Sequence, residues 1–122
     1  MKRILVVDDS EAIRGSLREL LAGELPGVVV SEAGAAAPAL AAIGREPWDL
    51  VMLDLSLPDR RGVETLRDIR ELSPALPVVV MSLHPEDEYR AAMRASGATD
   101  YVSKASSAPA IAAVVRAALG IG

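Results

Sequence analysis

The sequence has no cysteine and no phenylalanine, and its 122 residues include one histidine, one tryptophan and two tyrosines. The absence of cysteine excludes a disulfide framework, a thiolate zinc site and a cysteine nucleophile. Because His84 is the single histidine, a zinc site built from several histidines is excluded as well. With 21 alanines and so few aromatic rings, the chain is predicted to fill its core with small aliphatic side chains.

Positive charge and long apolar runs are also scarce. Lys and Arg number 13 against 17 Asp and Glu, a formal net charge of −4. This balance argues against direct nucleic-acid binding by the domain, because such binding relies on clustered basic side chains. No apolar run approaches the roughly 20 residues that cross a bilayer, and the stretch Ile4–Val7 is too short for a signal peptide. We therefore expect a cytoplasmic protein without membrane association.

Short β-branched runs alternate with longer helical stretches, a pattern typical of parallel strands joined by crossover helices. A length of 122 residues suits one domain, because two halves would be too small to bury separate cores. We predict an α/β fold over residues 1–122, a doubly wound five-stranded parallel sheet with five helices. The predicted strands are Arg3–Val7, Val28–Glu32, Leu50–Leu53, Val78–Met81 and Asp100–Ser103.

Helix signals lie between these strands. Apolar residues recur at helical spacing from Ile13 onward, and the alanine-rich stretch Ala35–Ala42 is predicted to be the second helix. Pro85, which precedes three acidic residues, is expected at the start of the fourth helix, and Gly97 at its end. Ser107 is predicted to be the N-cap of the last helix.

The residues that follow the strands are the candidates for function, because ligands of doubly wound sheets bind outside the carboxyl ends of the strands. At these positions the chain has Asp8 and Asp9, Asp54, Ser82 and Lys104. Carboxylates that share a crevice repel one another unless a cation compensates them. Lys104 offers one cation, and a hard divalent ion such as Mg²⁺ offers another. Together with the Ser82 hydroxyl, this set would surround a phosphoryl group on Asp54.

Separated motifs in the chain resemble the receiver domain of two-component response regulators, over nearly its full length. The motifs are the acidic pair Asp8-Asp9, the segment Leu53–Pro58, and the stretch from Gly97 through Tyr101 to Lys104. The resemblance implies the receiver fold, with strand order 2-1-3-4-5. It also implies that a sensor histidine kinase transfers a phosphoryl group from its phosphohistidine to Asp54, with Mg²⁺ as cofactor.

The same resemblance implies a role for each residue at the strand ends. Asp9, Asp54 and the backbone carbonyl of Ser56 would bind Mg²⁺ directly, and Asp8 would act through water.

The phosphoryl group itself would be met by two further side chains. Lys104 would pair with the phosphoryl oxygens, and Ser82 would be the switch hydroxyl that moves toward them. Tyr101 would be the switch aromatic, so that phosphorylation reshapes the surface of the fourth helix, fifth strand and fifth helix.

Local strings point to a subfamily. The strings Asp54–Asp59, Met81–His84 and Lys104–Ser107 are similar to those of NarL/FixJ-type receivers, which carry a C-terminal LuxR-type helix-turn-helix. The resemblance thus implies transcription regulation through a DNA-binding output domain, with a homodimer on phosphorylation as one route. We interpret the chain as a receiver cut from a longer regulator. The alternative is a stand-alone receiver that acts by protein–protein interaction.

Two residues depart from the commoner receiver pattern. Ala105 follows Lys104 where most receivers have proline, which leaves the geometry of the Lys104–Ala105 peptide open. Leu83 follows Ser82 where receivers often have alanine or glycine. This bulky side chain predicts restricted access to the site and slow turnover of the phosphoryl group.

Competing interpretations rest on the same residues. Asp8, Asp9 and Ser10 can be explained as a helix cap alone. A haloacid-dehalogenase-like phosphatase is disfavoured because its second acid would fall at Ser56 and no cap domain fits. A degenerate receiver is disfavoured because every acid and the lysine are present, and a flavin binder because aromatic residues are scarce. We therefore predict no enzyme activity beyond Mg²⁺-dependent self-phosphorylation and slow autodephosphorylation.

Several other residues are predicted to have structural roles. Four arginines crowd the segment after Asp54 and are interpreted as a solvated helix face rather than a kinase-docking patch: Arg60, Arg61, Arg67 and Arg70. Trp48 is expected to pack at the entrance to the third strand. The three internal methionines are expected in or near the core.

Overall fold

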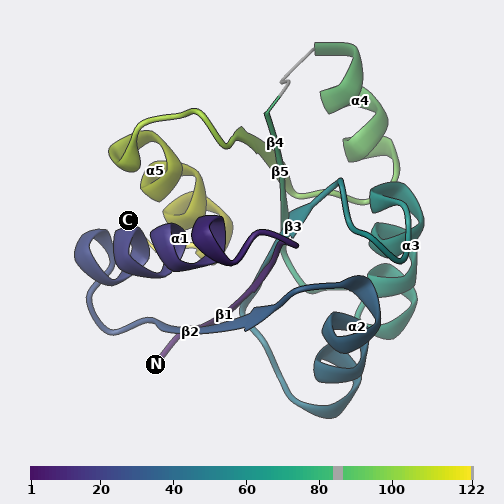
Figure 1. Cartoon of the computed structure of the whole chain (residues 1–122), viewed down its shortest axis with the longest axis horizontal. Coiled ribbons are helices and arrows are strands. Elements are labelled where there is room, and N and C mark those ends of the chain that lie inside the picture. The colour runs from purple at the N-terminus through teal and green to yellow at the C-terminus, as the bar shows by residue number, and fades with distance from the viewer. Residues whose placement is uncertain (84–86, 122) are drawn as a thin grey trace.

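The computed structural model describes residues 1–83 and 87–121, and the backbone alone for residues 87–90. Pro85, predicted at the start of the fourth helix, and His84, the last residue of the string Met81–His84, lie outside the described residues. Within them, five strands form one sheet that lies between two layers of helices (Figure 1). The strands are β1 (Arg3–Val7), β2 (Val29–Ala33), β3 (Leu50–Asp54), β4 (Val78–Ser82) and β5 (Asp100–Ser103).

All four pairs of neighbouring strands are parallel, in the order β2-β1-β3-β4-β5. The predicted fold class and strand order are therefore confirmed. The strand bounds agree with the predicted ones to within one residue, and β3 and β4 each extend one residue further. The reason is that Asp54 pairs in register with Met81 and Ser82 with Ser103, so these polar residues still belong to the sheet.

In the described part of the chain, two helices cover one face of the sheet and three cover the other. Helices α1 and α5 pack together on one side, whereas α2, α3 and α4 lie on the opposite side (Figure 1). The helices are α1 (Glu11–Glu24), α2 (Ala36–Arg45), α3 (Gly62–Leu72), α4 (Asp87–Ala95) and α5 (Ala108–Leu119). No helix in the described part of the chain has the length and apolarity needed to cross a bilayer.

The core consists of two aliphatic clusters separated by the sheet. Side chains of β1 alternate between them, since Ile4 packs on the α1 and α5 side and Leu5 on the other. Met52 and Met81 belong to the cluster on the α1 and α5 side, the first cluster, and Met93 belongs to the second cluster on the opposite side. All three have at most 2% of their surface exposed. The prediction that the internal methionines fill the core is confirmed.

Trp48 lies at the entrance to β3, as predicted. Its half-buried ring packs against the second cluster and donates a 3.0 Å hydrogen bond from Nε1 to the carbonyl of Ala42. The guanidinium of Arg3 lies 4.4 Å from the centre of the ring. The tryptophan therefore joins the end of α2 to the start of the sheet.

The helices begin in two different ways. Ser107 caps α5 by accepting a hydrogen bond from the amide of Ala110, as predicted. Ser10 caps α1 by accepting one from Ile13, as the capping interpretation of the first acidic segment proposes. Helix α2 instead has Ala35 at its N-cap position, and this side chain offers no acceptor. Its first amides must therefore be satisfied from elsewhere in the fold.

Candidate functional site

The carboxyl ends of β1, β3 and β5 bring three of the predicted site residues into contact. Asp8 follows β1 directly, Asp54 is the last residue of β3, and Lys104 follows β5. Because β4 lies between β3 and β5, the lysine side chain reaches across the end of β4. Its ammonium nitrogen lies 2.7 Å from Asp8 Oδ2 and 3.1 Å from Asp54 Oδ1. One cation therefore links the two aspartates.

Asp8 is buried and is held from several directions. Its Oδ1 accepts a 2.9 Å hydrogen bond from the amide of Ser10, and its own amide donates to the carbonyl of Ala33 at 3.1 Å. Its backbone carbonyl accepts a 2.6 Å hydrogen bond from Arg14 Nη1. Asp8 thus supports the start of α1, as the capping interpretation proposes, and lies within the ion-pair cluster at the same time.

Asp54 is held in an environment that disfavours its charge. Burial raises the pKa of Asp54, and the negative charge of Asp8 acts in the same direction. The amide of Ser56, which donates to Asp54 Oδ1 at 3.1 Å, and the ammonium of Lys104 favour the carboxylate without outweighing burial. The Asp54 carboxylate therefore gains from any additional cation that approaches it.

Lys104 shows the opposite balance. Burial on its own would lower the pKa of this ammonium group, but hydrogen bonds and charge interactions with Asp8 and Asp54 raise it overall. The lysine therefore stays protonated across the physiological range of pH, and its positive charge is fixed at the edge of the sheet.

The acidic residues form a cluster with oxygen donors suited to a divalent ion. Carboxylate oxygens of Asp8, Asp9 and Asp54 lie within 4.8 Å of one another, and Asp9 is exposed to solvent. Three ionised carboxylates against one ammonium group leave a local charge of −2. In the described part of the chain, the buried Asp54 Oδ2 has no hydrogen-bond donor. The buried Asp8 Oδ2 lies 2.7 Å from the Lys104 ammonium, whereas the contact of Lys104 with Asp54 uses Oδ1.

Asp54 Oδ2 is the observation that tests whether a metal fits this cluster. A buried carboxylate oxygen without a donor is costly, and coordination of a hard cation would satisfy it. Mg²⁺ prefers oxygen ligands, commonly one or two carboxylates together with water and phosphate oxygens. The donor set therefore fits the predicted cofactor.

The two predicted switch residues lie on neighbouring strands. Ser82 is the half-buried last residue of β4, and its carbonyl accepts a 2.8 Å hydrogen bond from the amide of Lys104. Tyr101 lies in β5 and is buried, with 3% of its surface exposed. Their roles in switching stay predictions.

The two departures from the receiver pattern are both visible at the site. No peptide bond among the described residues is cis, so the Lys104–Ala105 peptide is trans. The amide of Ala105 instead donates to Ser103 Oγ at 3.1 Å, which closes the turn after β5. Leu83 is 60% exposed and lines a small apolar pocket beside Lys104. Its effect on access stays a prediction.

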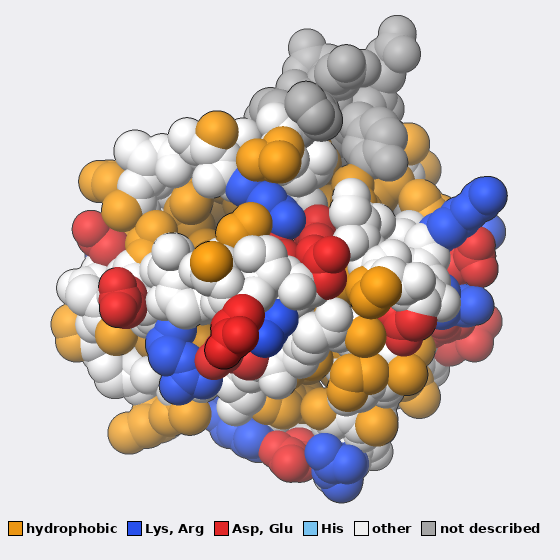
Figure 2. Space-filling view, viewed as in Figure 1, with side chains coloured by type: hydrophobic (Ala, Val, Ile, Leu, Met, Phe, Trp, Pro, Cys, Tyr) orange, Lys and Arg blue, Asp and Glu red, His pale blue; other side chains and the backbone are white. Residues whose placement is uncertain are grey.

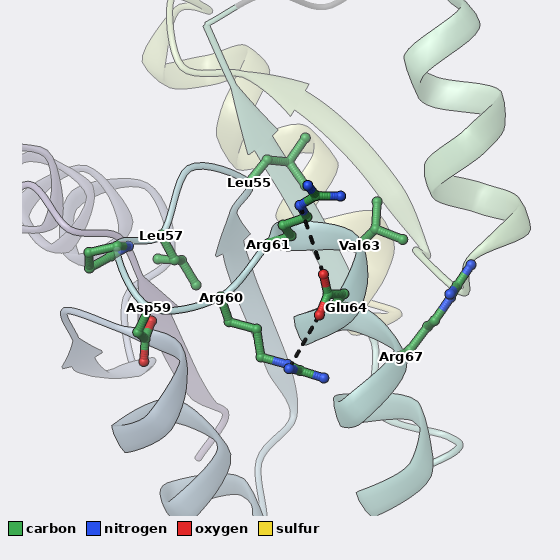
Figure 3. A pocket seen from close by; sticks show the side chains of 10 residues that line it. Leu55, Leu57, Asp59, Arg60, Arg61, Val63, Glu64 and Arg67 are labelled. Carbon is green, nitrogen blue, oxygen red and sulfur yellow. Dashed lines mark ion pairs between the residues drawn. The ribbon is translucent and has the colours of Figure 1, made fainter.

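The arginines after Asp54 divide into two groups. Arg60, Arg61 and Arg67 are exposed around an open pocket, where Glu64 lies 3.3 Å from Arg60 and 3.9 Å from Arg61 (Figure 3). Their exposure agrees with the prediction, but only Arg67 lies on α3, since Arg60 and Arg61 precede the helix. Arg70 contradicts the prediction, because this half-buried guanidinium turns away from solvent and donates to backbone carbonyls, including that of Gly97 at 2.7 Å.

Charged side chains also meet on the molecular surface. The space-filling view shows acidic and basic side chains in contact near the middle of the visible face (Figure 2). Near the carboxyl edge of the sheet, the sequence analysis did not predict the contacts of two residues, Arg14, described above, and Asp59. The carboxylate of Asp59 accepts hydrogen bonds from Ala36 and Ala37 at the start of α2. The sequence signal for this contact was Ala35 at the N-cap position of α2, because alanine cannot cap the helix and an acceptor from elsewhere is then needed.

Comparison with known proteins gives consistent results. Residues 4–116 match the family model of the response regulator receiver domain. The chain is 41% identical over 104 residues to the KDP operon transcriptional regulatory protein KdpE of Escherichia coli. It is 35% identical over 104 residues to the DNA-binding transcriptional activator DevR/DosR of Mycobacterium tuberculosis. Each alignment covers 85% of this chain but 45% and 48% of the relatives, so the chain spans about half their length.

A solved structure supports the same grouping. The structure of a LuxR-family two-component response regulator from Aurantimonas matches with a TM-score of 0.90 at 30% sequence identity. The match covers 97% of this chain and 84% of that one. The predicted similarity to NarL/FixJ-type receivers is compatible with this match.

Proposed function

Because the chain belongs to the response regulator receiver domain family, we propose that it is a phosphorylation-dependent switch whose phosphoacceptor is Asp54. The observation that carries this proposal is the environment of Asp54 itself. The carboxylate is buried and contacts Lys104 through Oδ1, while Oδ2 has no hydrogen-bond donor among the described residues. Such a group is positioned to react and poised to accept further positive charge.

The proposed reaction is a phosphoryl transfer from a sensor histidine kinase. An oxygen of the Asp54 carboxylate forms a bond to phosphorus, while the bond from phosphorus to the phosphohistidine nitrogen breaks. The electron pair of the broken bond stays on that imidazole nitrogen. Lys104, already 3.1 Å from the carboxylate, would pair with the phosphoryl oxygens and stabilise their charge.

We propose that Asp9, Asp54 and the carbonyl of Ser56 would hold Mg²⁺, with Asp8 acting through water. When bound, the ion supplies positive charge that neutralises the oxygens of the transferring group. The acidic cluster supports this assignment, because its carboxylate oxygens lie within 4.8 Å of one another.

The proposed output follows from the two switch residues and from the relatives. Ser82 would move toward the phosphoryl group and the side chain of Tyr101 would rotate, which would alter the surface formed by α4, β5 and α5. A difference of a few kcal/mol between two states is enough for such a shift. We propose that the domain catalyses only its own Mg²⁺-dependent phosphorylation and slow autodephosphorylation. We also propose that it works in the cytoplasm.

The proposed output domain rests on what the two relatives do. KdpE is a transcriptional regulatory protein and DevR/DosR is a DNA-binding transcriptional activator. We propose that the full-length protein likewise carries a DNA-binding helix-turn-helix domain, with dimerisation on phosphorylation. A stand-alone receiver that acts through protein contacts is the alternative.

Phosphorylation by a small phosphodonor in the presence of Mg²⁺ tests the assignment. We expect intact-mass spectrometry to show one added phosphoryl group on the wild type and none on Asp54→Asn. Asp68→Asn is the matched control, because it neutralises an aspartate on α3 that pairs with Arg60 away from the cluster. Equal labelling of the wild type and Asp54→Asn would contradict the proposal.

A further inference from the structure

The loop between β3 and α3 carries Ser56, and its base is closed by two contacts. Ser56 and Arg61 form an isolated antiparallel bridge across the loop. Gly62 lies against the backbone of Leu55, where a Cβ atom would come within 2.7 Å of the Leu55 Cα. The two ends of the loop are therefore held together directly beside Asp54.

The tip of the same loop is attached to a different helix. Asp59 Oδ1 accepts a 2.8 Å hydrogen bond from the amide of Ala36, and Oδ2 accepts a 2.9 Å bond from Ala37. These residues lie 23 and 22 positions earlier in the chain. Figure 3 shows Asp59 over the start of the helix that begins there. Both carboxylate oxygens are therefore used at the positive end of α2.

This contact replaces the cap that α2 lacks. Ala35, at the N-cap position, has no side-chain acceptor, whereas α1 and α5 use their own serines. The hydrogen bonds from Ala37 and Ala36 lower the pKa of Asp59, so the carboxylate stays charged at neutral pH. The attachment is therefore a charge-assisted pair of hydrogen bonds between two elements.

We propose that Asp59 is a positioning residue that holds the β3–α3 loop, and with it the Ser56 backbone, in place beside Asp54. The loop is closed at its base and tied to α2 at its tip, so the Ser56 backbone has little freedom. The amide of Ser56 donates to Asp54 Oδ1 at 3.1 Å, and its carbonyl is the proposed Mg²⁺ ligand. The inference rests on the proposed function for its consequence in metal binding, but not for the geometry of the loop.

A second role for Asp59 has to be separated from this one, because a cap also stabilises its helix. Loss of an N-cap acceptor costs stability wherever the acceptor comes from. Ala35 offers a way to distinguish the two roles, since its backbone (φ −157°, ψ 168°) has the extended conformation of an N-cap residue. Ala35→Asp would cap α2 locally without contacting the β3–α3 loop.

The test compares four forms of the full chain: wild type, Asp59→Ala, Asp59→Ala with Ala35→Asp, and Asp49→Ala. Asp49→Ala is the matched control, because it removes a carboxylate that accepts a backbone hydrogen bond, from the amide of Arg3, at the opposite end of β3 from the loop. Mg²⁺ affinity is measured by calorimetry and the free energy of unfolding by urea titration without Mg²⁺. We expect Asp59→Ala to weaken Mg²⁺ binding about tenfold, as loss of groups that orient metal ligands commonly does. Ala35→Asp should restore stability but leave the Mg²⁺ affinity low.

Hydrogen exchange of the Ser56 amide in Mg²⁺-free protein gives a readout that does not depend on the metal. We expect exchange to be faster in Asp59→Ala and to stay fast when Ala35→Asp is added. If the wild type binds no Mg²⁺, the proposed function fails while the exchange measurement still decides the positioning role. Unchanged exchange in Asp59→Ala, or recovery of both exchange and affinity on adding Ala35→Asp, would overturn the inference.

Discussion

Leu53 and Asp54 are consecutive residues of β3 with 0% and 2% of their surface exposed. Burial of Leu53 removes apolar surface from water and favours folding. Burial of Asp54 removes a carboxylate from water, which raises its pKa and opposes folding while the group is charged. The apolar body of the sheet and its charged carboxyl edge therefore differ in the sign of what burial contributes.

This difference shows how the fold supports a reactive site. The body contains two aliphatic clusters, one on each side of the sheet. The edge contains two buried aspartates and one lysine that compensates part of their charge. The first region supplies the stability that allows the second to keep an unsatisfied carboxylate oxygen ready for a ligand.

The largest effect on the free energy of unfolding is expected from a substitution in the apolar body of the sheet. Leu53→Ala should lower the free energy of unfolding by about 4 kcal/mol, because it removes buried methyl groups and leaves a cavity. Urea denaturation measures this change. Leu72→Ala is the control, since that side chain is 52% exposed and its loss should change stability by less than about 0.5 kcal/mol. Equal effects of the two substitutions would remove the basis of the comparison.

The next effect is expected at the edge, from loss of its cation. Lys104→Met should destabilise the Mg²⁺-free protein by about 3 kcal/mol, because it leaves Asp8 and Asp54 as uncompensated buried charges. Adding Asp54→Asn should recover most of this loss, since one buried carboxylate then remains. The double-mutant cycle uses urea denaturation, with the exposed Arg67→Met as control. Additive effects of the two substitutions would show that Lys104 and Asp54 are not coupled.

The smallest effect concerns the charge of Asp54 and its dependence on pH. Because the pKa of Asp54 is raised in the folded protein, its proton stabilises the fold at low pH. That contribution is lost as the pH rises from the usual aspartate pKa through the raised one. In Mg²⁺-free protein, Asp54→Asn should therefore be more stable than the wild type at neutral pH, by less than Lys104→Met destabilises it, and the difference should disappear in acid.

Urea titrations between acid and neutral pH measure this difference. Glu19→Gln, at an exposed position on α1, should show no comparable change. Saturating Mg²⁺ should reverse the order of stability, because the wild type would bind the ion more tightly than Asp54→Asn. A constant difference across the pH range would contradict the role given to the Asp54 charge.

Much of the fold could be predicted because its signals are local. The apolar runs that form β1 and β4 and the serine caps of α1 and α5 lie within a few residues of the elements they define. The strand ends then identified Asp8, Asp54 and Lys104 as neighbours, because parallel strands place their carboxyl ends at one edge. The prediction for Arg70 was wrong because its position on α3 did not reveal the carbonyls that converge on it.

By itself the sequence determined the alternation of strands and helices, the aliphatic core and the identity of the charged residues at the strand ends. The tertiary structure alone decided that Lys104 spans β4 to reach two aspartates, that burial outweighs this cation at Asp54, and that Asp59 caps a helix 22 residues before it. The physical reason is the distance along the chain over which each kind of interaction acts. Periodicity and caps depend on neighbours along the chain, whereas desolvation and charge pairing depend on every group that the fold brings close.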